Sequence, residues 1–275
     1  MWLLQISDPH VTVPGRLLWD VLDANARLLR LLAHVGRHGP RPDLVLVTGD
    51  LVGEEDPAAY AFLAGALADL GVPVLPLAGN HDDRTLLTAA FPDVPGRVHR
   101  DGRLLLDLPV GPVRLLGLDT LMPGRLDGEV GEDQRRWLAE RLAATAEPVL
   151  LALHHPPRAL GLPHMDRIGL VDGAALEETV AAADTRLRAV LAGHLHRFAV
   201  ARFAGAPLLT APSTAFTCAE EMLDREGVRR FVAEPPAALL HRLAADGTLT
   251  TFPVVAGPHP TLPPRRRDGE GMGGG

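Results

Sequence analysis

The sequence predicts an α/β protein in which two mixed sheets pack between outer helices, a four-layer α/β/β/α sandwich. Its first ninety residues alternate strand and helix in the order β-α-β-α-β, which implies a parallel sheet. Short strands separated by hairpin signals follow, and a second mixed sheet accommodates them. Five apolar strands each end just before Asp, Asn or His residues. Because sites in open α/β sheets form beyond the carboxyl ends of the strands, we expect one site fed by five strand ends.

Apolar runs and helix-start signals predict the elements of the first half. A helical stripe of apolar residues that includes Val21 and Leu22 indicates the first helix. Asp56-Pro57 is an N-cap and first-turn pair that opens the second helix. The expected elements are strand Trp2–Ile6, helix Trp19–Val35, strand Leu44–Val47, helix Ala58–Leu70 and strand Val74–Leu77.

The second half predicts shorter strands with fewer helices. Asp101-Gly102, Gly111-Pro112 and Asp246-Gly247 are turn signals, and Asp172 is expected to cap a helix that runs to about Ala183. The remaining expected elements are strands Arg97–His99, Arg103–Leu108 and Val113–Leu118, helix Glu132–Ala144, strands Val149–Leu153 and Leu187–Leu191, and then mostly antiparallel strands at Phe198–Phe203, Pro207–Thr210, Arg229–Val232, Ala238–Leu243 and Leu249–Val255.

Composition excludes several classes of protein. A single cysteine, Cys218, allows neither an intrachain disulfide nor a cysteine-based zinc site. The net charge of −7 argues against a polynucleotide-binding surface but permits a small phosphorylated substrate, because bound metal can invert the local field. No apolar run approaches the ~20 residues that cross a bilayer, and the N-terminus lacks the basic segment of a signal peptide. We expect a cytoplasmic protein with neither polynucleotide nor membrane as partner.

The polar residues after the strands are metal ligands by type and spacing. Two of the groups place their ligands two residues apart in extended segments, so both side chains project from one face. Together the groups offer more oxygen and nitrogen ligands than one transition metal needs, which suits two metals that share a bridging carboxylate. This mix favours Mn, Fe, Zn or Co, and two such ions about 3.5–4 Å apart stabilise displacement at phosphorus. The ligands are Asp8, His10, Asp50, Asn80, His154, His194 and His196.

These blocks resemble, in order, the pattern of the calcineurin-like metallophosphoesterases. The spacing is similar to that of the class III phosphodiesterases, which hydrolyse cyclic nucleotides and glycerophosphodiesters. Ile6-Ser7-Asp8, His154-His155-Pro156-Pro157 and Met165-Asp166 resemble the glycerophosphodiester members in particular. The matching segments are Asp8-x-His10, Gly49-Asp50, Gly79-Asn80-His81-Asp82, His154 and Gly193-His194-x-His196.

The resemblance covers roughly residues 1–215, which we expect to form the catalytic domain. Residues 216–262 would be C-terminal strands that complete the sandwich or form an oligomer contact, and residues 263–275 a disordered tail. Related phosphodiesterases pair their subunits through equivalent strand-rich regions. We therefore expect a homodimer or a higher homo-oligomer.

The resemblance implies a role for each residue. A metal-bound hydroxide would attack the phosphorus, because metal lowers the pKa of water to a usable range. His81 would lie near the phosphoryl oxygens or the leaving group, with Asp82 orienting it, and Asn80 would also contact the substrate. The first metal would be held by Asp8, His10, Asp50 and His196, and the second by Asp50, Asn80, His154 and His194.

Departures from the family pattern narrow the range of expected substrates. Protein phosphatases of the superfamily carry Asp-Arg-Gly in the second block and Glu after Asn-His, whereas this chain has Leu51-Val52-Gly53 after Asp50, and Asp82 after His81. Some glycerophosphodiester members place a substrate-facing His after the last strand, where this chain reads Pro212 to Phe216. Small diesters, either 3′,5′-cyclic AMP or glycerophosphodiesters, remain the expected substrates. A phosphomonoesterase and a non-catalytic metal-binding scaffold are the alternatives.

The substrate pocket would be walled by two loops, residues 11–18 and 158–171. Arg16, Arg158 and Arg167 in these loops could contact an anion. The scarcity of aromatic residues in both loops leaves Phe216 as the surface that could stack on adenine. His155, next to a ligand, is expected not to bind metal.

Overall fold

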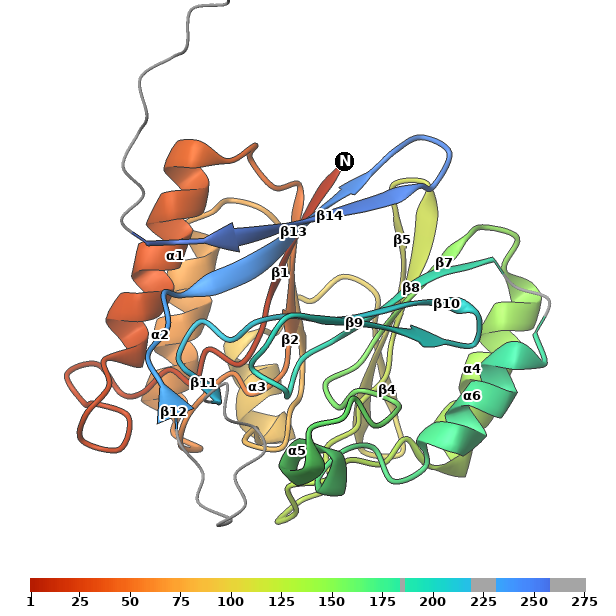
Figure 1. Ribbon diagram of the computed structural model, residues 1–275, viewed down its shortest axis with the longest axis horizontal. Helices are drawn as coiled ribbons and strands as arrows, with labels where there is room; N and C mark the ends of the chain where they lie inside the picture. Colours follow the sequence, from red (N-terminus) through yellow and green to blue (C-terminus); the bar gives the residue numbers. More distant parts are fainter. Residues whose placement is uncertain (184–185, 219–230, 258–275) are drawn as a thin grey trace, which may run out of the picture.

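Two sheets pack face to face with helices on both outer sides in the computed structural model, which describes residues 1–183, 186–218 and 231–257 (Figure 1). The predicted four-layer α/β/β/α sandwich is confirmed. The helices are α1 (Ala24–His38), α2 (Pro57–Ala68), α3 (Arg84–Ala90), α4 (Gly131–Ala144), α5 (Pro163–Arg167) and α6 (Gly173–Ala181). The strands are β1 (Trp2–Ile6), β2 (Leu44–Thr48), β3 (Val74–Leu77), β4 (Arg97–Arg100), β5 (Arg103–Val110), β6 (Val113–Gly117), β7 (Val149–Ala152), β8 (Leu187–Ala192), β9 (Ala199–Phe203), β10 (Ala206–Thr210), β11 (Thr217–Cys218), β12 (Phe231–Val232), β13 (Ala237–Leu243) and β14 (Leu249–Val255).

Both main sheets mix parallel and antiparallel pairs. The first has the order β14-β13-β1-β2-β3, in which β1, β2 and β3 are parallel, as the alternating pattern predicts. The second has the order β4-β5-β6-β7-β8-β10-β9, with a parallel centre formed by β6, β7, β8 and β10. The short strands β11 and β12 form a separate antiparallel pair. Parallel neighbours end at the same edge, so β1, β2 and β3 deliver their carboxyl ends together, as do β7 and β8.

The side chains of β1 alternate between two faces, so this strand packs against the helices on one side and against the second sheet on the other. Leu4 and Ile6 pack with the helices α1 and α2, whereas Leu3 faces the second sheet. Successive side chains of a strand point to opposite faces, so the apolar run is explained by burial on both sides. A third core lies between the second sheet and helices α4 and α6. Gln5 is a fully buried polar residue within the face that packs against the second sheet.

The first helix begins five residues later than the sequence predicts. Trp19 and Asp20 have φ of 51° and 60°, in the left-handed region that an α-helix cannot contain. The Asp23 side chain then accepts a hydrogen bond from the Ala26 backbone N–H and starts the helix. The sequence prediction started the helix at Trp19 because it used only the helical spacing of apolar residues. That spacing carries no information about φ.

The predicted role of Asp172 is also corrected. It precedes α6, as expected, but its side chain makes no capping hydrogen bond there. Its oxygens instead accept from the backbone N–H groups of Val130 and Gly131, at 3.0 and 2.9 Å, and pair with Arg135. Asp172 therefore caps the neighbouring helix α4, across a contact that only the tertiary fold creates.

The C-terminal strands join the first sheet. β13 pairs antiparallel with β1, and β14 pairs with β13 through the hairpin expected at Asp246-Gly247. Of the strand predicted at Arg229–Val232, only the residues of β12 belong to the described part of the chain, and the tail predicted at 263–275 lies outside it. Among the described residues, every helix is too short or too polar to cross a membrane.

Candidate metal centre

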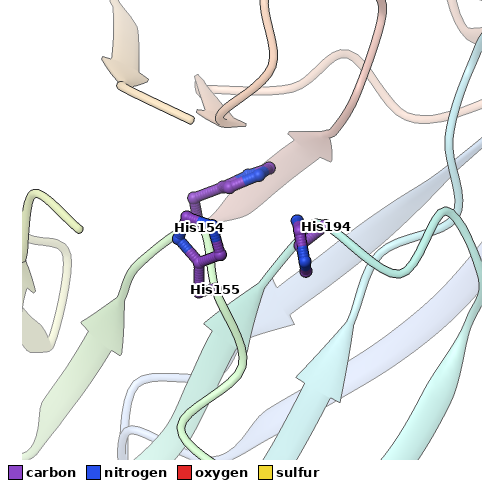
Figure 2. A group of neighbouring side chains, drawn as sticks. All are labelled: His154, His155 and His194. Atoms are coloured by element: carbon purple, nitrogen blue, oxygen red, sulfur yellow. The ribbon is translucent and has the colours of Figure 1, made fainter. Parts of the chain in front are cut away.

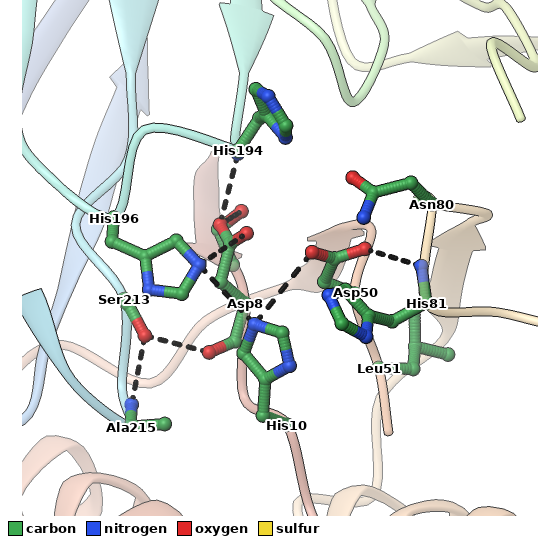
Figure 3. A network of polar contacts seen from close by, with 12 residues as sticks. Asp8, His10, Asp50, Leu51, Asn80, His81, His194, His196, Ser213 and Ala215 are labelled. Atoms are coloured by element: carbon green, nitrogen blue, oxygen red, sulfur yellow. Dashed lines mark hydrogen bonds and ion pairs between the residues drawn. The ribbon is translucent and has the colours of Figure 1, made fainter. Parts of the chain in front are cut away.

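The predicted ligands meet where strands of the two sheets end, and all of them except His154 are labelled in Figure 3. Asp8 and His10 follow β1, Asp50 follows β2 and Asn80 follows β3. His154 follows β7, and the pair His194 and His196 follows β8. Asn80 and His81 are partly exposed, whereas the remaining predicted ligands are buried.

One group of donors surrounds the carboxylate of Asp8. The Nε2 atoms of His10 and His196 lie 3.2 Å apart, and His196 Nε2 lies 3.3 Å from Asp8 Oδ1. His10 Nε2 lies 3.6 Å from Asp50 Oδ2. One ligand atom from each of these four residues lies within 4.8 Å of the others, a spacing that one metal ion would bridge.

A second group lies on the other side of Asp50. His154 Nε2 is 3.4 Å from Asp50 Oδ1 and 3.3 Å from Asn80 Oδ1. His194 lies next to His154, with ring centroids 5.1 Å apart. The Asp50 carboxylate therefore faces one group with each oxygen, which is the arrangement a bridging ligand requires.

Two buried atoms at this centre lack any hydrogen-bond partner. Asp8 Oδ1 and His194 Nε2 are inaccessible to solvent and make no hydrogen bond within the described residues, although His196 Nε2 lies 3.3 Å from Asp8 Oδ1. Burial of such atoms is costly unless a ligand satisfies them. The Nδ1–H groups of His154 and His196 donate to the carbonyl oxygens of Thr48 and Phe216, at 2.7 and 2.9 Å. These bonds leave the Nε2 lone pairs facing the centre, as metal-binding histidines require. The donor set fits divalent metal ions.

His155 lies beside the second group without being free to join it (Figure 2). Its Nδ1 lies 2.7 Å from Thr120 Oγ1 and its Nε2 lies 3.1 Å from the Leu126 carbonyl oxygen. In a neutral ring, Nε2–H donates to the carbonyl and Nδ1 accepts from the hydroxyl, so no lone pair remains for a metal. His155 is close enough to His154 and His194 to be grouped with them, but its hydrogen bonds favour the predicted non-ligand role.

The backbone carries strain at the ligands. Five of the seven have φ in the left-handed region: Asp8 at 49°, His10 at 42°, Asp50 at 51°, His194 at 69° and His196 at 55°. Such conformations cost energy and cluster at functional sites, where they turn the chain sharply out of a strand. Gly79 allows the strands to approach this closely, since a Cβ there would lie 2.3 Å from Asp50 Oδ1.

Comparison with known proteins agrees with this geometry. The family model of calcineurin-like phosphoesterases matches residues 1–198. The chain belongs to the calcineurin-like phosphoesterase family. A cAMP/cGMP dual specificity phosphodiesterase of Mycobacterium tuberculosis is 39% identical over 221 residues, which are 78% of this chain and 68% of that protein. A protein of Arcobacter nitrofigilis named "Probable glycerophosphodiester phosphodiesterase" is 30% identical over 258 residues, 94% of each chain.

A solved structure shows the same fold. A dimetal phosphatase from Danio rerio superposes with a TM-score of 0.64 at 16% identity, covering 94% of this chain and 99% of that one. At this identity the likeness concerns the fold alone. The phosphoesterase fold is thus shared, and the assignment of ligands and substrate rests on the residues of this chain.

Residues that sequence analysis did not single out hold Asp8 in place. Ser7 Oγ–H donates to Asp8 Oδ2 at 2.5 Å, and Thr48 Oγ–H donates to Ser7 Oγ at 2.8 Å. Gln5 Nε2–H donates to Thr48 Oγ1 at 3.1 Å and, across the sheets, to the Ala192 carbonyl oxygen at 3.0 Å. The chain of donors orients Asp8 so that Oδ2 is satisfied and Oδ1 is left for a metal.

The Asp82 carboxylate links the loops that carry Asp50 and Asn80. Its carboxylate accepts from the backbone N–H groups of Leu51 and Gly79 and from the Tyr60 hydroxyl, at 2.8 to 3.2 Å, and none of its hydrogen bonds goes to His81. It ties the loop after β2 to the loop after β3. These three donors hold the Asp82 carboxylate in the described structure, and its orienting of the His81 ring stays a prediction.

Electrostatics favour charged carboxylates at the first group but act on its two imidazoles in opposite directions. Burial lowers the pKa of His196, but the Asp8 and Asp50 carboxylates outweigh it and raise that pKa above its ordinary value. Burial lowers the pKa of His10 to about 3, which leaves its ring neutral and able to bind metal. Burial would raise the pKa of Asp50, but the His154 and His10 imidazoles outweigh it and lower that pKa well below its ordinary value. Burial, reinforced by the charge of Asp50, raises the pKa of Asp82 to about 7.

Of the residues predicted to contact the substrate, His81 lies at the centre, whereas Phe216, Arg16 and Arg167 are engaged with other residues. The His81 backbone N–H donates to Asp50 Oδ1 at 2.9 Å, and the His81 ring packs edge-on against His10 with centroids 4.9 Å apart, so the partly exposed imidazole lies at the centre. Phe216 is only 6% exposed and packs on His196, which leaves it little surface for a substrate. Arg16 pairs with Glu54 at the surface, and Arg167 lies 3.4 Å from His164.

One hollow adjoins the second group. Pro156, Met165 and Leu170 line it together with His194 and Arg158. Arg158 donates to the Arg202 carbonyl oxygen at 2.6 Å, which fixes its guanidinium near this hollow. Among the three predicted arginines, Arg158 is the one that the structure places beside a predicted ligand.

Proposed function

We propose that this chain is a phosphodiesterase that uses two divalent metal ions to hydrolyse small diesters, with 3′,5′-cyclic AMP and glycerophosphodiesters as its substrate classes. The names of the relatives from Mycobacterium tuberculosis and Arcobacter nitrofigilis support both classes. The observation that carries the proposal is the position of Asp50, which faces one group of donors with each carboxylate oxygen.

Each group offers a complete set of ligands in this proposal. The first ion would bind Asp8, His10, Asp50 and His196, and the second would bind Asp50, Asn80, His154 and His194. When bound, the ions would supply Lewis acidity and lower the pKa of a water molecule into the neutral range. Mn, Fe, Zn and Co all suit this mixture of carboxylate, amide and imidazole ligands.

His81 is the residue that would handle the leaving group. When a P–O bond of the diester breaks, its alcohol leaves as an alkoxide unless a proton reaches the departing oxygen. A positioned imidazole supplies that proton efficiently near neutral pH. The ring of His81 is partly exposed at the centre, and its own backbone N–H holds the bridging carboxylate. Asn80 lies one residue earlier, so its amide and the imidazole approach the same phosphoryl group from one loop.

A substrate panel tests the proposal. Values of kcat/KM for cyclic AMP, glycerophosphoethanolamine and p-nitrophenyl phosphate would be compared with Mn²⁺ at one concentration. We expect turnover of at least one of the two diesters to exceed that of the monoester. A tenfold preference for the monoester would replace the proposal by a phosphomonoesterase. No turnover of any of them, or of bis(p-nitrophenyl) phosphate, above a blank with metal alone would indicate a non-catalytic scaffold.

A further inference from the structure

An aromatic shelf extends from the metal centre to the surface of the protein. It consists of Trp19, which lies between β1 and α1, Phe216, which directly precedes β11, and Phe231, which belongs to β12. Trp19 packs against Phe216 with ring centroids 4.7 Å apart and stacks on Phe231 at 5.0 Å with an interplanar angle of 30°. Phe216 and Phe231 meet edge to face at 4.9 Å. The shelf is therefore one continuous cluster of rings.

The inner end of the shelf contacts two predicted ligands of the first metal. The Phe216 ring lies 4.3 Å from the ring of His196 and 5.2 Å from that of His10, centroid to centroid. The Phe216 carbonyl oxygen also accepts the hydrogen bond from His196 Nδ1. The outer end is open, because Trp19 and Phe231 are 52% and 43% exposed. Trp19 is thus one ring removed from the metal centre and presents its indole to solvent.

The conformation of Trp19 is strained for so bulky a side chain. Its φ of 51° lies in the left-handed region, which bulky residues rarely adopt. Backbone strain of this kind persists where the surroundings impose it and clusters at ligand-binding sites. Exposure and strain at a tryptophan beside the metal centre therefore mark it as a candidate contact for a bound substrate.

We propose that the shelf of Trp19 and Phe231 binds the nucleobase of a cyclic nucleotide whose phosphate lies at the metal centre. This inference rests on the proposed phosphodiesterase function and deepens it by naming the residues that favour nucleotides over glycerophosphodiesters. Every base has a flat π-face, and stacking on aromatic rings is a sequence-tolerant source of affinity. The near-parallel stacking of Trp19 and Phe231 favours a flat base over the quaternary ammonium of glycerophosphocholine, which prefers a cage of rings around it.

The variant Trp19→Ala tests the shelf. Loss of one stacking ring should lower kcat/KM for cyclic AMP roughly tenfold relative to glycerophosphoethanolamine, mainly through KM. Trp19→Phe should retain most of the preference. Val21→Ala is the matched control, because Val21 is 77% exposed on the same loop and belongs to no ring contact of the shelf. In this variant, kcat/KM for cyclic AMP relative to glycerophosphoethanolamine should stay as in the native protein.

Binding of a product gives a second readout. Titration with AMP should quench tryptophan fluorescence in the native protein and quench it less in Trp19→Phe, whereas glycerol 3-phosphate should have no such effect. Turnover of cyclic AMP with an unchanged substrate ratio in Trp19→Ala would overturn the shelf while leaving the phosphodiesterase proposal intact. A selective loss of glycerophosphocholine turnover would replace the nucleobase by a choline group. A change from dimer to monomer with unaltered selectivity would make the shelf a subunit contact.

Discussion

Single residues at the centre are positioned by neighbours that do not bind metal themselves. His154 is directed by the Thr48 carbonyl oxygen, His196 by the Phe216 carbonyl oxygen and Asp8 by the Ser7 hydroxyl. Such outer partners fix the ring orientation and raise the basicity of a ligand. Left-handed φ values add a second constraint at five of the seven predicted ligands, because they hold each of those residues at one angle to its strand. The geometry is consequently set before any ion arrives.

Replacement of His81 by Ala should separate catalysis from metal binding. We expect His81→Ala to keep its metal content but to lose roughly 10²–10⁴-fold in kcat, the range for a general acid. The backbone N–H that holds Asp50 remains in the variant, so the bridging carboxylate stays in place. Metal analysis of the purified variant beside steady-state kinetics is the measurement. Loss of metal from His81→Ala would instead make His81 a ligand.

Removal of the Ser7 hydroxyl should weaken metal binding. Ser7→Ala leaves Asp8 Oδ2 with only the His194 backbone N–H, at 3.1 Å, and frees the carboxylate to rotate. We expect Mn²⁺ affinity to fall about 10–100-fold, the usual effect of losing an outer partner of a ligand. Calorimetric titration of chelator-treated protein measures it. Thr179→Val, which loses a hydroxyl bond within α6 far from the centre, is the control; equal affinities in the two variants would contradict the role of Ser7.

The residues that meet at the centre were predictable from sequence, whereas the residues that support them were not. Each ligand follows an apolar run and belongs to an ordered block, so local pattern is enough to find it. Gln5 and Thr48 instead look like ordinary strand residues, and their function depends on which strand lies beside which. The contact between Tyr60 and Asp82 could not be predicted for the same reason, because Tyr60 comes from helix α2 and only the fold brings its hydroxyl to 3.0 Å from the Asp82 carboxylate.

At the scale of elements, strands were predicted better than helix starts. The turn signal Asp246-Gly247 marks the end of β13 and the start of β14, and β14 matches its predicted bounds. Helix starts depend on φ and on capping partners, which periodicity does not report. Helix α1 starts late because Trp19 and Asp20 are left-handed, and α4 takes its cap from Asp172 rather than from a neighbour in sequence.

The cap of α4 makes a prediction about stability. Asp172→Ala removes the acceptor for two backbone N–H groups and the partner of Arg135, and α4 has no side-chain cap of its own. Because the orphaned donors are partly buried, the free energy of unfolding should fall by about 1–3 kcal/mol. Urea denaturation measures the change. Asp172→Asn, which keeps one acceptor oxygen, should lose less; an equal loss in both would show that charge rather than capping is responsible.

For the whole molecule, the assembly remains a prediction. We expect a homodimer or a higher homo-oligomer, because strands beyond Phe198 exceed what a minimal pair of sheets needs. Strand β14 is the outer strand of the first sheet, and Phe252 and Val255 on it are 46% and 37% exposed. Light scattering at micromolar concentration measures the mass, and a monomeric mass would contradict the prediction.

The burial of His241 in β13 should make the stability of the whole molecule depend on pH. His241 in β13 is fully buried, where Nε2–H donates to Gln5 Oε1 at 3.0 Å and Nδ1 accepts from Thr251 Oγ1 at 2.8 Å. Burial lowers the pKa of His241 to about 3, against about 6.5 in an unfolded chain. Between these two values the unfolded chain binds a proton that the folded protein does not. The free energy of unfolding therefore falls as pH falls below about 6.5, at up to about 1.4 kcal/mol per pH unit.

His241→Gln removes this titration while keeping an amide that can meet both partners. From pH 7.5 to pH 5, the native protein should lose about 2 kcal/mol more of its unfolding free energy than His241→Gln does. Urea denaturation in the presence of a chelator measures both curves, and the histidines of the metal centre, which are identical in the two proteins, cancel in the difference. Parallel curves over this range would mean that folding leaves the pKa of His241 unchanged, and that the interior between β13 and the second sheet admits a charge.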